Sequence, residues 1–214
     1  MTAKIKICGL MRSQDVECAV SAGASYLGVV FAEGPRAVTS NRAREVVTVA
    51  AGVPVVGVFA DHSVEEILQI ADQTQLRTVQ LHGRYAEPAA QRLRSEGLKV
   101  WRVVRIAVPS DLDLLIDAMP ASDAVLVEPR VAHARGGAGV PLDLAVAQEA
   151  RARLAGHRMV LAGGLTPETV GEAVSLVRPE VVDVSSGVER QPGIKDFTKI
   201  ARFVEAVFAH SSIS

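Results

Sequence analysis

The chain has 214 residues, of which 49% are hydrophobic and 22% are charged, and its formal net charge at pH 7 is −1. A chain of this length and composition can bury a substantial core, so we expect a globular protein. The 23 basic residues are spread along the chain, so we expect no strongly positive surface that would attract nucleic acid or an anionic membrane. No apolar run approaches 18 residues and no signal-like segment precedes Lys4, so the sequence predicts neither a membrane span nor export.

The chain contains two cysteines, Cys8 and Cys18, which lie at a predicted strand end and in a predicted helix. Their spacing is not typical of a metal site or of a disulfide framework. We therefore expect no bound metal ion. Free thiols persist in a reducing compartment, so the sequence favours a cytoplasmic location.

Short apolar runs rich in Val and Ile alternate along the chain with segments of helical composition. The predicted strands are residues 4–8, 26–31, 54–59, 77–82, 99–104, 123–128, 158–162 and 181–185. The predicted helices lie near residues 13–22, 41–51, 64–74, 86–96, 110–118, 143–154, 167–177 and 196–209. Two helices have clear start signals: a capping box of Ser63 and Glu66, and the pair Thr166-Pro167.

Eight strands that alternate with eight helices predict a (β/α)8 barrel, a TIM barrel of parallel strands whose chemistry lies at the carboxyl ends of the strands. No linker rich in Pro, Gly or Ser interrupts the series, so we expect residues 1–214 to form a single domain. The alternative is a doubly wound open sheet. That fold usually has fewer strands, and a dinucleotide-binding sheet has G-x-G-x-x-G where this chain has Cys8-Gly9-Leu10.

The first predicted strand ends in a thiol, Cys8, followed by a glycine. Side chains alternate along a strand, so Lys6 and Cys8 share one face at roughly 7 Å, from the ~3.3 Å rise per residue. A cation at this range favours thiolate over thiol, which makes Cys8 a candidate base. On these residues alone, a buried and inert cysteine is the alternative.

Polar side chains also lie at the ends of other predicted strands. Gln80 and His82 share one face of the fourth strand, Asp183 and Ser185 share one face of the eighth, and Glu128 ends the sixth. Polar groups inside a parallel barrel are costly unless they pair or serve a site. Several such strands together indicate a functional site.

For single residues the structural alternatives stay open. His82 could be a core histidine whose hydrogen bonds are satisfied. Asp183 could pair with Lys6 or with Arg102 of the fifth strand.

Turns that contain glycine follow the last three predicted strands. They read Gly136-Gly137-Ala138-Gly139, Gly163-Gly164-Leu165-Thr166 and Ser185-Ser186-Gly187. Glycine lets backbone N–H groups approach an oxyanion closely, and barrels commonly bind phosphate after strands seven and eight. The sequence therefore predicts a small phosphorylated substrate. The candidate phosphate-binding residues are Gly137, Gly139, Gly163, Gly164, Ser186 and Gly187.

Six segments carry a family resemblance. They are Lys6-Ile7-Cys8-Gly9-Leu10, Gly34-Pro35-Arg36, Val56-Gly57-Val58-Phe59, Val79-Gln80-Leu81-His82-Gly83, Leu161-Ala162-Gly163-Gly164-Leu165, and Asp183 to Glu189 followed by Pro192 to Asp196. In this order they resemble phosphoribosylanthranilate isomerase of tryptophan biosynthesis, and the resemblance covers essentially the whole chain. It implies a (β/α)8 barrel that converts N-(5-phosphoribosyl)anthranilate to 1-(2-carboxyphenylamino)-1-deoxyribulose 5-phosphate without a cofactor. A monomer and a homodimer are both compatible with the sequence.

The reaction implied by this resemblance is an Amadori rearrangement. It needs an acid that protonates the ring oxygen and a base that removes the proton from C2. The resemblance implies that Cys8 is the base, that the acid is the carboxylate ending strand six, here Glu128, and that Arg36 binds the anthranilate carboxylate. A planar guanidinium suits such a group. The further candidate substrate-binding residues are Lys6, Gln80, His82 and Asp183.

The chain departs from the family at the end of strand six, where it has Glu128 in place of the family's Asp. The extra methylene moves the carboxylate, and a misplacement on the order of 1 Å can cost about a hundredfold in rate. Residues 130–135 and Leu142-Asp143-Leu144 of the following loop are also unusual. An acid must keep its proton, and we expect the enclosed barrel mouth, with Asp183 nearby, to raise the pKa of Glu128 accordingly.

Two alternative functions stay open at this point. One is the related aminoaldose isomerase of histidine biosynthesis, which is expected to use paired aspartates at strands one and five where this chain offers Cys8. The other is a degenerate barrel that binds a phosphosugar without turning it over, which Glu128 and the altered loop make conceivable. Detectable isomerase turnover distinguishes the second alternative from an enzyme.

Overall fold

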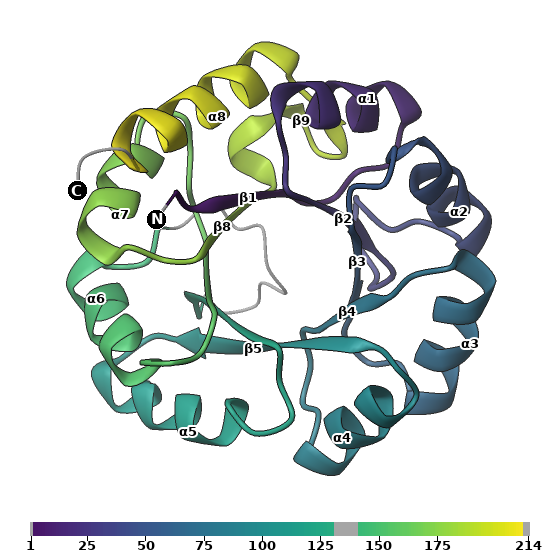
Figure 1. Cartoon of the computed structure of the whole chain (residues 1–214), viewed down its shortest axis with the longest axis horizontal. Helices are drawn as coiled ribbons and strands as arrows, with labels where there is room; N and C mark the ends of the chain where they lie inside the picture. Colours follow the sequence, from purple (N-terminus) through teal and green to yellow (C-terminus); the bar gives the residue numbers. More distant parts are fainter. Residues whose placement is uncertain (1, 131–140, 212–214) are drawn as a thin grey trace.

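The computed structural model describes residues 2–130 and 141–211, and eight parallel strands form a closed barrel within a ring of helices (Figure 1). Each strand pairs with the next, and β8 pairs with β1. The strands are β1 (Lys4–Ile7), β2 (Tyr26–Val30), β3 (Val55–Phe59), β4 (Thr78–Leu81), β5 (Lys99–Ile106), β6 (Ala124–Pro129), β7 (Met159–Ala162) and β8 (Val181–Val184). The predicted (β/α)8 barrel is therefore confirmed, whereas a single domain over residues 1–214 stays a prediction.

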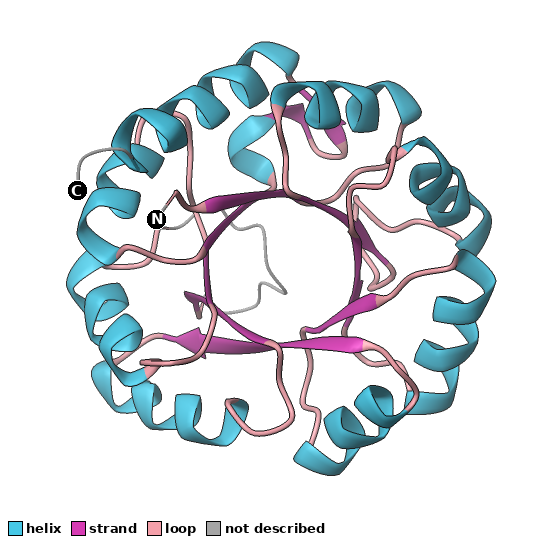
Figure 2. Ribbon diagram, in the orientation of Figure 1, coloured by secondary structure: helices cyan, strands magenta, loops and turns pink. Residues whose placement is uncertain are grey.

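Helices follow the strands and cover the outside of the barrel (Figure 2). They are α1 (Ser13–Ala22), α2 (Ser40–Val49), α3 (Val64–Thr74), α4 (Glu87–Ser95), α5 (Leu114–Ala118), α6 (Leu144–Arg153), α7 (Val170–Val177) and α8 (Phe197–Ser211). Two 3₁₀ turns, η1 (Pro109–Asp113) and η2 (Ser186–Val188), precede α5 and follow β8. Within the described ranges no helix is long and apolar enough to cross a membrane.

The structure corrects the sequence prediction in three places. Strand β5 continues to Ile106, beyond the predicted end at residue 104. A small antiparallel pair, β9 (Glu189–Gln191) and β10 (Ile194–Lys195), follows β8 and was not predicted. Helix α7 begins at Val170 rather than at residue 167, because the Thr169 hydroxyl accepts a hydrogen bond from Thr166 N at 3.0 Å and holds a turn before the helix.

Local sequence signals explain other elements directly. The predicted capping box of α3 is present: Glu66 N donates to the Ser63 hydroxyl at 3.2 Å, and Ser63 N donates to the Glu66 carboxylate at 2.7 Å. Along β1, Ile5 and Ile7 pack in the layer between barrel and helices. Lys6 therefore points into the barrel, as alternation predicts.

The inside of the barrel is filled with a cluster of apolar side chains, most of which lie below the carboxyl ends of the strands. Its members are Val56, Trp101, Ala124, Leu126, Val160, Ala162 and Val181. The ring of Tyr26 packs edge-on against Trp101, with 5.1 Å between the ring centroids. This packed layer forms a floor, so a small molecule can enter the barrel only above it, at the carboxyl ends of the strands.

Candidate active site

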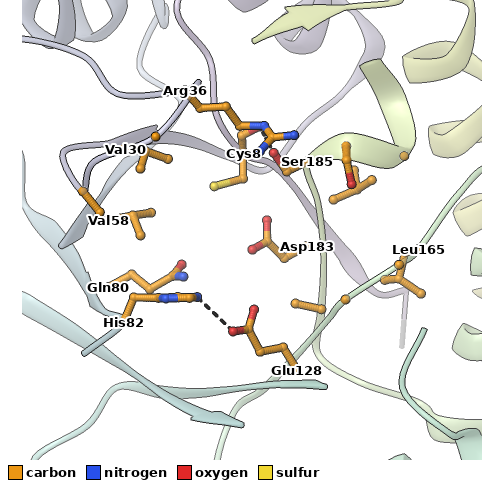
Figure 3. A pocket seen from close by; sticks show the side chains of 18 of the residues that line it. Cys8, Val30, Arg36, Val58, Gln80, His82, Glu128, Leu165, Asp183 and Ser185 are labelled. Atoms are coloured by element: carbon orange, nitrogen blue, oxygen red, sulfur yellow. Dashed lines mark hydrogen bonds and ion pairs between the residues drawn. The ribbon is translucent and has the colours of Figure 1, made fainter. Parts of the chain in front are cut away.

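The carboxyl ends of the strands surround a cavity of about 390 Å³ (Figure 3). It is lined by most of the residues that the sequence predicted for the site: Cys8, Arg36, Gln80, His82, Glu128, Gly163, Gly164, Asp183, Ser186 and Gly187. Lys6 lies beneath the lining, fully buried. The predicted phosphate-binding residues Gly137 and Gly139 lie outside the described residues. Alternation along parallel strands thus brings residues far apart in sequence to one cavity.

The thiol of Cys8 occupies space that a missing side chain leaves open. A Cβ atom at Gly28 of β2 would lie 2.7 Å from the Cys8 Sγ, so only glycine leaves room for the sulfur there. Cys8 N donates to Val184 O at 2.8 Å, and the Ser185 hydroxyl donates to Cys8 O at 3.2 Å. The backbone of Cys8 is therefore held by β8 and the residue after it, while Gly28 of β2 leaves room for the sulfur.

Burial raises the pKa of the Cys8 thiol, and the Lys6 ammonium offsets this only in part. Lys6 therefore favours the thiolate as expected, but its effect is smaller than that of burial, and the net pKa of the thiol lies above its ordinary value. Lys6 Nζ donates to Asp183 Oδ2 at 2.9 Å, in an ion pair that is buried on both sides. The negative charge of Asp183 acts in the same direction as burial on the pKa of the thiol, but its effect is smaller than that of Lys6.

This ion pair decides between the partners considered for Asp183. Lys6 and Asp183 are register partners of β1 and β8. Arg102 points to the outside of the barrel instead, where it donates to Tyr85 O at 3.0 Å. The second carboxylate oxygen, Asp183 Oδ1, and the Gln80 Oε1 are buried acceptors that find no partner within the described residues. A ligand with hydroxyl donors could satisfy both.

Glu128 belongs to a three-membered cluster with His82 and Arg105. Its Oε1 lies 2.8 Å from Arg105 Nε and 3.0 Å from His82 Nε2, and Arg105 Nη2 lies 2.6 Å from His82 Nδ1. Burial acts to raise the pKa of Glu128, but the hydrogen bond from His82 and the charge and hydrogen bond of Arg105 outweigh it and hold this pKa below its ordinary value. Enclosure therefore acts in the expected direction, but the expectation of a raised pKa is wrong.

The sequence did not identify Arg105 as a site residue, because strand five was predicted to end at residue 104, directly before it. The signal was available. Trp101 faces the interior, and an alternation continued from it places Val103 and Arg105 on the inner face as well.

Arg36, which follows β2, is held by a carboxylate from the hairpin after β8. Arg36 Nε lies 2.9 Å from Glu189 Oε1, and Arg36 Nη2 lies 2.7 Å from Glu189 Oε2. Behind them, Lys195 Nζ lies 3.0 Å from Glu189 Oε1 and 3.0 Å from Ser185 O. Burial acts to raise the pKa of Glu189, but Arg36 and Lys195 outweigh it and keep it low. Glu189 and Lys195 were not predicted as part of the site.

The glycine turns after β7 and β8 are packed so closely that side chains would not fit. A Cβ at Gly163, whose φ is +96°, would lie 2.1 Å from Pro129 Cδ, and a Cβ at Gly187 would lie 1.9 Å from Leu165 O. Both glycines line the cavity with Ser186. Backbone without side chains can approach an anionic group closely, so this wall suits a phosphate.

The described part of the chain, residues 2–130 and 141–211, contains no group of three or more His, Cys, Asp or Glu that could hold a metal ion. The polar groups that face the cavity instead include a thiol, two carboxylates, an imidazole, an amide and a guanidinium. Such a set can move protons and bind an anionic substrate.

Comparison with protein families is decisive. The model of N-(5'-phosphoribosyl)anthranilate isomerase matches residues 5–206. The chain belongs to this family. A relative named N-(5'-phosphoribosyl)anthranilate isomerase from Pseudomonas fluorescens is 37% identical over 204 residues, which cover 94% of this chain and 97% of the relative. One from Symbiobacterium thermophilum is 39% identical, with 94% and 96% covered.

Solved structures of the isomerase family agree with the sequence match. The phosphoribosylanthranilate isomerase of Thermotoga maritima superposes with a TM-score of 0.88 at 32% identity, over 97% of this chain and 99% of that one. A further isomerase structure, at 31% identity and a TM-score of 0.85 over the same shares, contains reduced 1-(o-carboxyphenylamino)-1-deoxyribulose 5-phosphate. The family recognised from the motifs is therefore confirmed, and the open-sheet alternative is wrong.

Proposed function

We propose that this chain isomerises N-(5'-phosphoribosyl)anthranilate to 1-(2-carboxyphenylamino)-1-deoxyribulose 5-phosphate. The family match over residues 5–206 carries this conclusion. The cavity supports it, because a thiol, a carboxylate, an arginine and glycine turns face one space. The ligand in one related structure is the reduced form of this product.

The chemistry requires one acid and one base, and Cys8 and Glu128 lie on opposite sides of the cavity (Figure 3). In our proposal Glu128 gives a proton to the furanose ring oxygen, the C1–O bond breaks, and the nitrogen lone pair forms a C=N⁺ bond. The Cys8 thiolate then takes the C2 proton, and its electron pair moves to give the enolamine. Tautomerisation of the enolamine yields the ketose.

The protein without substrate holds both groups in the opposite protonation states. Cys8 keeps its proton because burial raises the pKa of the thiol, and Glu128 is ionised because His82 and Arg105 outweigh the effect of burial on its pKa. The reactive form differs by the transfer of one proton from Cys8 to Glu128. The reactive form therefore carries the same total number of protons as the major form, but it is the less populated of the two.

Substrate binding in our proposal uses three separate groups. Arg36 presents to the cavity the guanidinium edge that Glu189 does not occupy, and this edge binds the anthranilate carboxylate. The turns with Gly163, Gly164, Ser186 and Gly187 bind the phosphate. The buried acceptors of Gln80 and Asp183 accept hydrogen bonds from the ribose hydroxyls.

For the oligomeric state we propose only that the chain is a monomer or a homodimer. The Thermotoga maritima relative is described as a dimeric isomerase from which monomers were generated. Both forms predicted for this chain therefore occur among its relatives. We further expect the reaction to need no metal ion and no nucleotide, since acid, base and anion-binding groups all belong to the chain.

The function is tested by complementation of two bacterial auxotrophs. The gene should restore growth without tryptophan to a strain that lacks this isomerase, and should not restore a strain that lacks the corresponding isomerase of histidine biosynthesis. Purified protein should turn over phosphoribosylanthranilate at the same rate after treatment with a chelator. Failure to complement together with absent turnover by folded protein would favour the degenerate barrel, and rescue of the histidine strain alone would favour the histidine enzyme.

A further inference from the structure

A second cavity, of about 950 Å³, lies beside the first and opens between the ends of β3, β4 and β5 and helix α5. Arg105 lines only this second cavity, Glu128 lines only the first, and His82 lines both. The three side chains therefore form a wall between the two spaces. Arg105 reaches Glu128 from behind, on the side away from the proposed substrate.

The contacts within this wall define where the protons lie. A guanidinium can only donate hydrogen bonds, so His82 Nδ1, 2.6 Å from Arg105 Nη2, must be an acceptor without a proton. The neutral ring then carries its proton on Nε2, which donates to Glu128 Oε1 at 3.0 Å. Because Arg105 Nε donates to the same oxygen at 2.8 Å, Glu128 Oε2 is left to face the cavity.

The backbone explains why these groups meet. Arg105 and Glu128 are register partners of β5 and β6, and their side chains lie on the same face of the sheet. The extension of β5 to Ile106 is what brings Arg105 level with the end of β6. The Arg105 side chain is 29% exposed, whereas those of Glu128 and His82 are nearly buried, so the arginine retains access to water through the second cavity.

We infer that Arg105 is a positioning residue for the isomerisation: from the second cavity it fixes the Nε2–H tautomer of His82 and the direction of the Glu128 carboxylate, without touching the substrate. The inference rests on the proposed function for its link to catalysis. Its structural half, the tautomer and the carboxylate geometry, does not depend on that function.

The charge of Arg105 adds an electrostatic effect to this geometry. Besides Glu128, the titratable side chains that line the first cavity are Cys8 after β1, Glu33 and Arg36 after β2, His82 after β4 and Asp183 of β8, and Arg105 of β5 contacts Glu128 from the second cavity. Lys6 is already paired with Asp183. Among these groups, His82 and Arg105 lower the pKa of Glu128.

The first test measures the imidazole directly. In protein labelled with ¹⁵N at histidine, His82→Gln identifies the His82 signals among those of the five histidines. We expect wild-type His82 to show one protonated and one unprotonated nitrogen, at Nε2 and Nδ1, and Arg105→Met to move both signals toward an exchange average. Arg102→Met is the matched control, because Arg102 lies on the same strand but points outward to backbone carbonyls. Unchanged His82 signals in folded Arg105→Met would overturn the inference.

The second test is the pH profile of kcat/KM. When the acid has a lower pKa than the base, the acidic bend of the profile reports the acid, here Glu128. Removal of a charge this close should raise that bend by about 1 pH unit. Arg105→Met should show this rise with a lower kcat and a KM near that of wild type, and Arg102→Met should show neither change.

Arg105→Lys separates charge from geometry. The lysine keeps the positive charge, so the acidic bend should stay low, but it lacks the planar fork that contacts His82 and Glu128 together, so the tautomer should not be restored. A higher KM with an unmoved bend in Arg105→Met would place Arg105 on the substrate and overturn the inference. Absence of isomerase activity in wild type would overturn the proposed function alone, since the imidazole signals are read without substrate.

Discussion

The Glu189 carboxylate holds Arg36 through two parallel contacts, of 2.9 and 2.7 Å, and so joins the loop after β2 to the hairpin after β8. The contacts use Nε and Nη2, which lie on one edge of the guanidinium. The other edge, formed by Nη1 and Nη2, stays available to a second carboxylate. Lys195, 3.0 Å from Glu189, fixes the carboxylate from behind. The arginine is thus preorganised for an anionic ligand and loses little freedom on binding.

Arg36→Ala should raise the KM for phosphoribosylanthranilate by about 10- to 100-fold, the worth of a hydrogen bond to a charged group, with a smaller effect on kcat. The carboxylate it binds lies away from the bonds that change. The sharpest control is the analogue made from aniline, which lacks the carboxylate and should be processed equally by both proteins. Arg42→Ala, at an exposed ion pair on α2, should leave KM unchanged. An equal KM for wild type and Arg36→Ala would show that Arg36 does not bind the substrate.

Glu189→Gln should reproduce part of the Arg36→Ala effect on KM, although Glu189 does not line the cavity. The amide keeps the shape of the side chain but supplies only one acceptor to Arg36 and removes the negative charge that lies between two cations. A half-buried arginine and a buried lysine would then face each other without an anion, so the melting temperature should also fall. Glu189→Asp should recover more of the stability than of the KM, because the charge returns while the reach to Arg36 is shorter. Unchanged KM in Glu189→Gln would show that Arg36 needs no support.

The barrel was predictable because its signal is local and repeated: each strand is an apolar run, and each helix follows at a short distance. Alternation along a strand also identified Cys8, Gln80 and Asp183 as inward residues. The same rule failed for Arg105 only because the end of β5 was placed too early. No periodicity marks Glu189 or Lys195, since they lie in a short hairpin whose pairing with the β2 loop exists only in three dimensions.

The protonation states of the site were not predictable from sequence for a different reason. A pKa depends on the partners that a charge finds after folding. Lys6 acts on Cys8 in the expected direction, but burial of the thiol outweighs it and raises the pKa. Asp183 was expected to act on Glu128, but His82 and Arg105 are in direct contact with that carboxylate.

Cys8→Ser should lower kcat by several orders of magnitude while the protein stays folded. A hydroxyl is a far weaker base than a thiolate, and the smaller oxygen fits the space beside Gly28. Gly28→Ala tests the same site from the other side. Its new methyl would lie 2.7 Å from the Cys8 sulfur and should displace it, so kcat should fall with Cys8 still present. Near-normal turnover by Cys8→Ser would make the thiol purely structural.

The pH profile of wild-type kcat/KM should be flat through neutral pH. The pKa of Glu128 lies below the ordinary value of a glutamate, and that of Cys8 lies above the ordinary value of a thiol. Between these two pKa values, a rise in pH increases the fraction of Cys8 thiolate by the same factor by which it decreases the fraction of protonated Glu128. The fraction of the reactive form, which needs both, is therefore constant. The rate should fall only when pH drops through the Glu128 pKa or rises through the Cys8 pKa. A maximum with bends close to pH 7 on both sides would contradict these assignments.

Glu128→Gln keeps the shape of the side chain and removes the proton, so kcat should fall by about 10² to 10⁴, the usual contribution of general acid catalysis. The variant should bind substrate with a KM near that of wild type, because Glu128 is proposed to act on a bond rather than on affinity. Full activity in Glu128→Gln would place the acid elsewhere. Asp183, whose Oδ1 is buried and finds no partner within the described residues, would then be the first candidate.

Glu128→Asp tests whether the residues around position 128 are adapted to glutamate or merely tolerate it in place of the family's aspartate. His82 and Arg105 hold the glutamate oxygen at 3.0 and 2.8 Å, and a carboxylate one methylene shorter cannot reach both without movement of the strands. We therefore expect Glu128→Asp to be slower than wild type by up to about a hundredfold, the cost of a misplacement on the order of 1 Å. Its acidic bend should also move to higher pH, since the contacts that lower the pKa of Glu128 weaken. An aspartate variant that equals or exceeds the wild type in kcat would show that the surrounding residues have not adapted to glutamate.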